Sequence, residues 1–107
     1  MIYTMFTFSV PRGKVNEILE FLGKEVFPRD QELASKVGGK IVGVWSTVYG
    51  NVGEITGMAA WPSLDARQKF MDLPKDEKCQ KVLAKWMELT PNATSKAMRP
   101  APFSPLQ

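Results

Sequence analysis

Two adjacent glycines, Gly38 and Gly39, divide a helix-like pattern from a run rich in β-branched residues. That run covers residues 40–49 and is followed by Gly-Asn-Val-Gly at 50–53, which is typical of a turn. A second strand-like run, residues 54–61, begins at once. Because glycine stops helices and β-branched residues favour strands, this stretch predicts a β-hairpin at the centre of the chain, with a helix on either side.

The N-terminal stretch, residues 2–10, has the composition of a strand and precedes Pro-Arg-Gly at 11–13, a turn signal. Successive side chains of a strand point to opposite faces, so its alternating pattern separates two sides. The apolar side comprises Ile2, Phe6, Phe8 and Val10, and the mixed side comprises Tyr3, Met5, Thr7 and Ser9. We predict a first strand here.

From residue 14 the apolar spacing becomes three and four, which indicates a helix that reaches to about residue 37. Pro28 interrupts this pattern, because it lacks a backbone donor and crowds the carbonyl of Lys24. The apolar stripe resumes beyond Pro28, so we predict one kinked helix. The charged residues on its other sides are Glu17, Glu20, Lys24, Glu25 and Asp30.

A second helical region follows Pro62, with Ser63 as the expected N-cap and Asp65 favourable in the first turn. Pro74 is expected to break this region and to occupy the first position of a further helix. The apolar stripe of that helix comprises Cys79, Val82, Leu83 and Trp86, and Thr90 and Pro91 are expected to end it.

Residues 93–98 are expected to form a last strand, and the proline-rich residues 100–107 an extended arm with Phe103 and Leu106 as apolar anchors. The predicted order is therefore βαββαβ. This is the α+β, ferredoxin-like arrangement, in which two helices cover one face of an antiparallel four-stranded sheet. We predict one domain over residues 1–99, followed by the arm.

Both strands of the central hairpin carry apolar residues on both faces. In the first strand, one expected face carries Ile41, Trp45 and Tyr49, and the other carries Val42, Val44 and Val48. In the second strand, one face carries Ile55, Ala59 and Trp61, and the other carries Met58 and Ala60. A sheet covered on one side only should alternate apolar and polar residues. We therefore expect a second copy to cover the free face in a homodimer.

Composition excludes several classes of function. The 107 residues contain no histidine, which removes His-ligated metal or haem and catalysis with a His base, so we expect no metal and no cofactor. One cysteine suits a reducing compartment, and no segment has the features of a targeting signal or a membrane span, so the expected location is cytoplasmic. A net charge of +3 is ordinary, and no nucleic-acid motif accompanies it, so we expect neither a nucleic-acid nor a membrane partner.

Three segments, residues 38–45, 61–67 and 99–106, together resemble the NIPSNAP-like group of the dimeric α+β barrel superfamily. In that family a Gly-Gly turn leads into a strand ending in Trp, a Trp-x-Ser-Leu-x-x-Arg corner opens the second helix, and a proline-phenylalanine tail closes the chain. Pro62 stands where members carry a Tyr. The resemblance implies the fold and a dimer. Superfamily relatives include cofactor-independent monooxygenases, haem-degrading enzymes and dehydratases, and the family supplies no catalytic residues to carry over.

Four residues are candidates for a ligand-binding cleft beside the sheet: Tyr3, Trp45, Trp61 and Arg67. The aromatic residues would form walls for a flat, apolar or aromatic ligand, and Arg67 would bind a carboxylate or oxyanion. The alternatives are core or dimer packing for the aromatic residues, and a surface ion pair with Asp65 or Glu54, or exposure to solvent, for Arg67. Cys79, with no histidine to activate it, is expected to be a buried structural thiol.

These observations leave three functions open. The first is a small dimeric NIPSNAP-like protein that binds a small apolar or aromatic molecule beside the sheet. The second is a cofactor-independent monooxygenase of aromatic substrates, in which Tyr3, Trp45 and Arg67 would position the substrate. The third is a non-catalytic interaction module whose tail, residues 103–106, docks on a partner.

Overall fold

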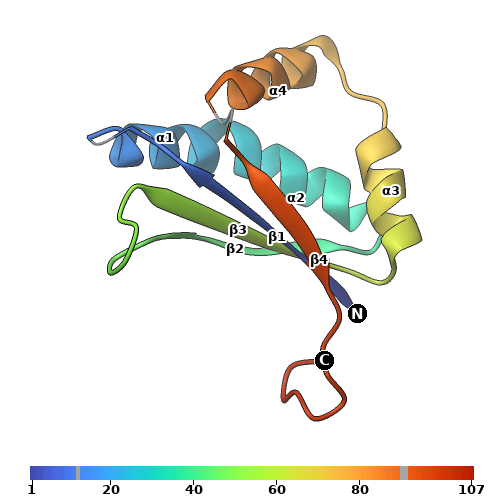
Figure 1. Ribbon diagram of the computed structural model, residues 1–107. Coiled ribbons are helices and arrows are strands. Elements are labelled where there is room, and N and C mark those ends of the chain that lie inside the picture. The colour runs from blue at the N-terminus through green and yellow to red at the C-terminus, as the bar shows by residue number, and fades with distance from the viewer. Residues whose placement is uncertain (12, 90–91) are drawn as a thin grey trace.

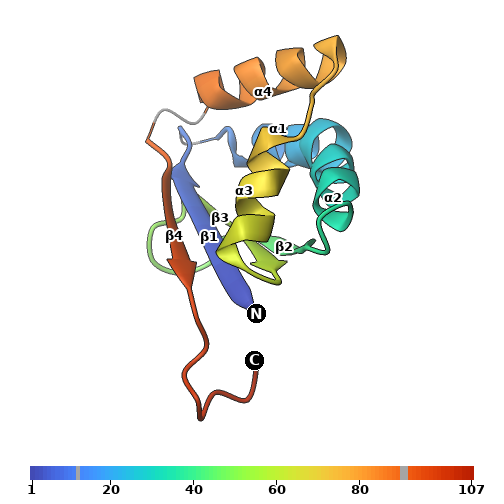
Figure 2. The same ribbon diagram turned by 90° about the vertical axis from the view of Figure 1, so that its right-hand side faces the viewer.

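The described residues, 1–11, 13–89 and 92–107 of a computed structural model, form one antiparallel sheet with helices on one of its faces (Figures 1 and 2). The strands are β1 (Ile2–Ser9), β2 (Lys40–Ser46), β3 (Glu54–Trp61) and β4 (Thr94–Met98). The helices are α1 (Val15–Phe21), the π-helical η1 (Leu22–Val26), α2 (Phe27–Ser35), α3 (Leu64–Asp72) and α4 (Glu77–Leu89). The strand order β2-β3-β1-β4 is that of the predicted ferredoxin-like fold, which is confirmed.

The register between β1 and β3 decides which side chains face the helices. Phe8 lies opposite Ile55 and Ile2 lies opposite Trp61, and all four are buried. Residues directly opposite each other share a face of the sheet. The helix-facing side therefore carries the apolar side of β1 and the set Ile55, Ala59 and Trp61 of β3, as the alternation predicted.

A β-bulge in β2 changes the predicted faces of that strand. Ile41 pairs with Ala59 and Gly43 pairs with Met58, so the register shifts between Ile41 and Gly43. The extra residue of a bulge reverses the alternation beyond it. Ile41 and Val44 therefore share the helix-facing side, and the prediction that Ile41 and Trp45 share a face is wrong.

The hairpin loop is longer than predicted. β2 ends at Ser46 rather than at residue 49, and Val48 and Tyr49 are 90% and 96% exposed. Thr47 closes the loop, because its N–H and its Oγ1 both donate to the carbonyl of Glu54. Apolar side chains near the tip of this hairpin thus lie in solvent instead of extending the sheet.

The first helical region runs from Val15 to Ser35 without a gap, as predicted for one helix rather than two. A π-helical segment lies within it, where the N–H of Phe27 donates to the carbonyl of Leu22, five residues back. This wide turn lies directly before Pro28, where a regular helix would need the backbone donor that proline lacks. The region ends at Gly38, whose φ of 78° is the left-handed conformation that favours glycine after a helix.

The second helical region begins and breaks as predicted, but its second helix starts later. The hydroxyl of Ser63 accepts a hydrogen bond from the N–H of Ala66 at 3.1 Å, which is the expected N-cap of α3. The next helix, α4, starts at Glu77 rather than at Pro74. Asp76 is its cap instead, since one carboxylate oxygen accepts from the N–H of Cys79 at 2.7 Å.

Two apolar clusters join the helices to the sheet. One is built on Phe8, Val10, Ile18, Leu22 and Ile55, with Phe6 and Trp86 packed against it. The other is built on Ala34, Ala59 and Trp61, with Val37, Ile41 and Phe70 around it. The ring of Trp86 in α4 stands edge-on to Phe8 at a centroid distance of 4.8 Å. The space between these two clusters is where the candidate site lies.

The C-terminal residues 100–107 curl into a loop below the sheet (Figure 1). The side-chain amide of Gln107 donates to the carbonyls of Ala101 and Ser104, and the hydroxyl of Tyr3 donates to the carbonyl of Gln107 at 2.8 Å. Phe103 is 89% exposed. The predicted extended arm is thus a closed loop, and its expected anchor Phe103 does not pack on its own chain.

Two expected boundaries fall outside the described residues: the turn at Arg12 and the helix end at Thr90 and Pro91. In the parts of the chain that are described, every helix is too short or too polar to cross a bilayer.

Candidate functional site

A cavity of about 580 Å³ lies between the sheet and the helices, and we call it the cleft. The sheet contributes one wall through Phe6, Phe8, Ile41, Val44, Gly57, Ala59 and Trp61. Helical residues contribute the other, including Leu22, Val26, Leu33, Phe70, Val82, Leu83 and Trp86. These residues include members of both apolar clusters, so the cleft borders both. Its lining is mainly apolar, with a few polar groups.

Trp61 forms a rigid part of the sheet wall. Its side chain is 2% exposed, and its indole Nε1 donates to the hydroxyl of Thr4 at 2.9 Å. Phe70 of α3 packs against the same indole at a centroid distance of 4.9 Å. A ring held on one edge by a hydrogen bond and covered by another ring keeps one orientation.

The four sequence-predicted cleft residues lie on opposite faces of the sheet. Trp61 and Arg67 both line the cleft. Tyr3 and Trp45 belong to the face that points away from the helices, since Tyr3 lies opposite Ala60 and Trp45 lies opposite Thr56. Tyr3 contacts the C-terminal loop, whereas Trp45 is 49% exposed. The structure thus brings two of the four together.

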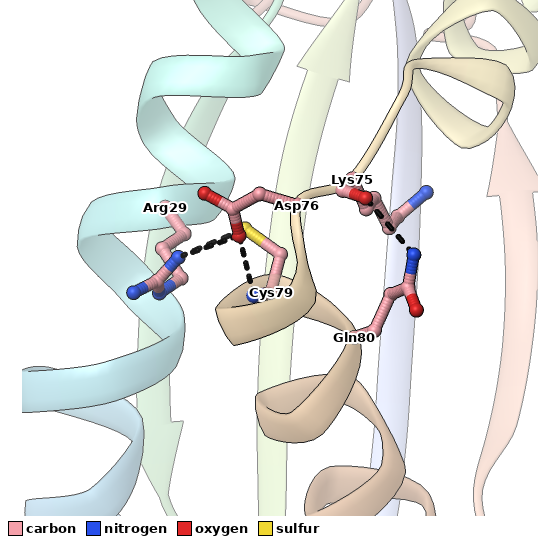
Figure 3. Close-up of polar contacts among 5 residues, drawn as sticks. All are labelled: Arg29, Lys75, Asp76, Cys79 and Gln80. Atoms are coloured by element: carbon pink, nitrogen blue, oxygen red, sulfur yellow. Dashed lines mark hydrogen bonds and ion pairs between the residues drawn. The ribbon is translucent and has the colours of Figure 1, made fainter.

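A polar cluster joins α2 to the first turn of α4 (Figure 3), and two of its residues, Arg29 and Cys79, line the cleft. Nη1 of Arg29 donates to Sγ of Cys79 at 2.9 Å and lies 3.9 Å from a carboxylate oxygen of Asp76. The hydrogen bond from the backbone N–H of Cys79, together with nearby Arg29, holds the pKa of Asp76 below its ordinary value. Cys79 is half-buried in the cleft lining, rather than the buried core thiol that its stripe predicted.

Asp30 places a carboxyl group in the apolar cleft. Burial raises its pKa from 3.8 to about 6, and the charge of Lys75 partly opposes this rise. Among the described residues, the Asp30 side chain has no ion pair within 4 Å and no hydrogen bond. A carboxyl group whose pKa lies close to neutrality can exchange protons with a ligand near physiological pH.

Lys75 and Arg67 complete the charged lining. Nζ of Lys75 donates to the carbonyl of Met71 in the last turn of α3 and to the carbonyl of its C-cap, Leu73. The Lys75 carbonyl accepts from the side-chain amide of Gln80 (Figure 3). The Arg67 guanidinium is different, because within the described ranges it has no hydrogen-bond or ion-pair partner. The expected surface pairs with Asp65 and Glu54 do not form.

Sequence reasoning missed Arg29, Asp30 and Lys75 as cleft residues. Asp30 is predicted to lie off the apolar stripe, yet it follows Val26 by four residues and precedes Leu33 by three. Regular helical spacing therefore puts Asp30 on the stripe, and this spacing was the available signal. Lys75 is in a loop, where no periodicity applies.

The described residues contain no group of three or more Cys, Asp and Glu that could hold a metal ion. The cleft offers one thiol and one carboxyl group, Cys79 and Asp30, beside three cationic side chains. Its chemistry is that of a pocket for an organic molecule: an apolar body of space with a few charged groups on its wall.

The ferredoxin-like fold of this chain is also that of an antibiotic biosynthesis monooxygenase. The crystal structure of that enzyme superposes with a TM-score of 0.59 at 12% identity, over 95% of this chain and 100% of its own, a likeness in fold alone. The NIPSNAP family model matches residues 3–105, and the chain therefore belongs to the NIPSNAP family.

Solved family members cover the same length. A NIPSNAP family protein of unknown function from Agrobacterium tumefaciens is 29% identical, with a TM-score of 0.76 over 100% of this chain and 94% of its own. A second NIPSNAP family protein from that organism is 24% identical, with a TM-score of 0.82 over 99% of this chain and 98% of its own. Among curated proteins there is no match.

Proposed function

We propose that this NIPSNAP family protein binds a small, mainly apolar or aromatic molecule in the cleft. The observation that carries the proposal is the cavity of about 580 Å³ with its apolar lining. Ligand pockets of proteins enclose roughly 300–1,000 Å³ and combine apolar walls with a few polar groups. The rigid indole of Trp61 supplies a flat wall on the sheet side.

Gly57 offers a direct test, because it lines the cleft and a Cβ atom built on it meets no atom within 4 Å. Its backbone has ordinary strand geometry, so a larger side chain can extend into the cleft without strain. Gly57→Phe should fill the cavity while leaving the fold intact. Gly23→Ala is the matched control, since Gly23 also has open space around its Cβ but lies outside the cleft lining.

The measurement is native mass spectrometry of freshly purified protein, followed by titration with a fluorescent apolar probe, N-phenyl-1-naphthylamine. We expect a reproducible bound mass or probe affinity in the wild type and in Gly23→Ala, and at least a tenfold loss of probe affinity in Gly57→Phe. Equal probe binding by all three proteins would reject the cleft as the binding site.

A cofactor-independent monooxygenase is a second candidate, and Asp30 is the observation that favours it. A carboxylate in an apolar cleft, with a pKa of about 6, can take a proton from an activated CH₂ group of an aromatic substrate. The substrate anion would then reduce O₂: one oxygen atom enters as a carbonyl, and the other leaves as water with the two hydrogens. Oxygen uptake with anthrone, abolished by Asp30→Asn, is the expected result, and uptake no faster than in buffer would reject it.

We also propose that the protein is a cytoplasmic homodimer. The sheet face opposite the helices carries Trp45, 49% exposed, with Met5 and Met58 half-buried on the neighbouring strands. A second copy that applies the same face would remove this apolar surface from water. If the cleft binds nothing, the exposed Phe103 supports the alternative of a non-catalytic interaction module.

A further inference from the structure

The charged side chains that line the cleft differ in whether they have a partner within the protein. Arg29 is held by Cys79 and Asp76, and Lys75 is held by the carbonyls at the end of α3. Of these three cations, only Arg67 has a side chain with no hydrogen-bond or ion-pair partner in the described parts of the chain. Three cations and one carboxyl group, Asp30, leave the cleft with a positive balance.

We propose that the ligand of the cleft is an amphipathic organic anion, whose carboxylate or sulfonate group binds the Arg67 guanidinium and whose apolar body lies against the sheet wall. This inference rests on the proposed function and names its ligand class. A guanidinium group presents its donors as a planar fork that matches the two oxygens of a carboxylate. In a mainly apolar cavity such a pair is weakly screened, so a single unpaired cation selects strongly for an anion.

The position of Arg67 strengthens this assignment. It follows Ser63 by one helical turn, and its backbone N–H donates to the Ser63 carbonyl, so it stands in the first turn of α3. The positive end of the helix dipole adds to the attraction for an anion there. The sheet wall, in contrast, contributes no charged side chain to the described lining and suits an apolar body.

Asp30 makes the binding depend on pH. The titratable and charged groups that line the cleft with it are Arg29 on its own helix, Arg67 on α3, Lys75 in the following loop and Cys79 on α4. When Asp30 is ionised it repels an anionic ligand, and when it is protonated it does not. Since its pKa is about 6, the affinity for an anion should rise as the pH falls through that value.

Two probes that differ in one group test the proposal. 1-Anilinonaphthalene-8-sulfonate is N-phenyl-1-naphthylamine with an added sulfonate, which stays ionised throughout the range used. At pH 7 we expect the wild type to bind the sulfonate at least tenfold more tightly than the neutral probe. Arg67→Met should remove that preference and leave the affinity for the neutral probe within about twofold.

Arg99→Met is the matched control, because it removes one positive charge from a residue outside the cleft lining. It should leave both affinities unchanged. Arg67→Lys should restore part of the sulfonate preference, since the charge returns without the planar fork. Near-UV circular dichroism must match the wild type for each variant, because partly unfolded proteins also bind the sulfonate probe.

The pH arm uses Asp30→Asn. Wild-type affinity for the sulfonate should rise severalfold from pH 8 to pH 5, and Asp30→Asn should bind tightly at both pH values. If the two probes bind equally, and Arg67→Met changes neither, the anion proposal is overturned while the cleft remains a binding site. If neither probe binds and Gly57→Phe changes nothing, the proposed function and this inference both fail.

Discussion

The indole Nε1 of Trp61 donates a hydrogen bond of 2.9 Å to Oγ1 of Thr4, across the two central strands of the sheet. Thr4 lies opposite Ala59 in the register, two residues before Trp61, so the bond runs diagonally over the helix-facing side. It satisfies the polar edge of a side chain that is 2% exposed, and it fixes the plane of a ring that lines the cleft.

Thr4→Val should therefore destabilise the protein by more than the small change in side-chain shape alone would cause. Valine has nearly the same volume but accepts no hydrogen bond, so the buried indole N–H would lose its partner at a cost of about 1–3 kcal/mol. Urea denaturation followed by circular dichroism measures the change. Thr7→Val is the control, because Oγ1 of Thr7 lies 3.5 Å from that of Thr56, at the limit of a hydrogen bond on the other face. Equal losses in both variants would contradict the role given to Thr4.

Gly39→Ala should be destabilising because of Trp61, for a reason distinct from backbone conformation. A Cβ atom at residue 39 would lie 2.5 Å from Cε3 of Trp61 and 3.0 Å from the carbonyl oxygen of Ala60. Neither atom can move freely, so we expect a loss of about 1–3 kcal/mol and a changed near-UV spectrum. Gly38→Ala should cost about 1–2 kcal/mol, mainly through its positive φ, with a further tight contact of its Cβ with Cγ of Pro62 at 3.3 Å. A Gly39→Ala protein with wild-type stability and spectrum would contradict this close approach.

The sequence was sufficient for the element order because its local signals agree with the tertiary structure. The glycines at 38 and 39, the alternation in β1 and β3, and Ser63 as the N-cap each predict one feature, and all of these are found. The faces of β2 could not be predicted, because the bulge inserts one residue between Ile41 and Gly43 and no residue pattern in the strand specifies it.

Register also limits what the sequence could say about the site. Trp61 and Arg67 could be proposed as cleft residues, because each stands at a recognisable position of a strand or helix. Tyr3 and Trp45 are large amphipathic residues on strands, but the side of the sheet on which each lies depends on the register. Asp30 reaches the cleft from a position between Val26 and Leu33 that regular spacing puts on the apolar stripe, but its charge argues against a place in an apolar lining.

The raised pKa of Asp30 should lower the free energy of unfolding at neutral pH. Its pKa is raised from 3.8 to about 6 in the folded protein, so between these values the folded state binds more protons than the unfolded state. The free energy of unfolding therefore falls as the pH rises from about 4 to about 6, and the penalty is complete above about 6. A rise in pKa of this size corresponds to about 3 kcal/mol at most.

Asp30→Asn should accordingly stabilise the protein at pH 8 by up to about 3 kcal/mol and should remove this part of the pH dependence. Thermal unfolding at pH 4.5 and pH 8 in each variant measures it. Glu32→Gln serves as the control, since Glu32 lies exposed on the same helix. If Asp30→Asn were less stable than the wild type at pH 8, Asp30 would have a stabilising partner that the structure does not contain.

Trp45 should decide the oligomeric state, if two sheets pack face to face. Analytical ultracentrifugation of the wild type should give twice the monomer mass of 12.0 kDa. Trp45→Lys places a charge within the expected interface and should shift the protein to monomer, because a buried charge without a partner is costly. Tyr49→Lys, in the solvent-exposed hairpin loop, should remain dimeric. A wild type that stays monomeric at high concentration would contradict the dimer, and the apolar residues of this face would then contact water or a different partner. The exposed Phe103 in the loop at 100–107 would be the first residue to test for contact with such a partner.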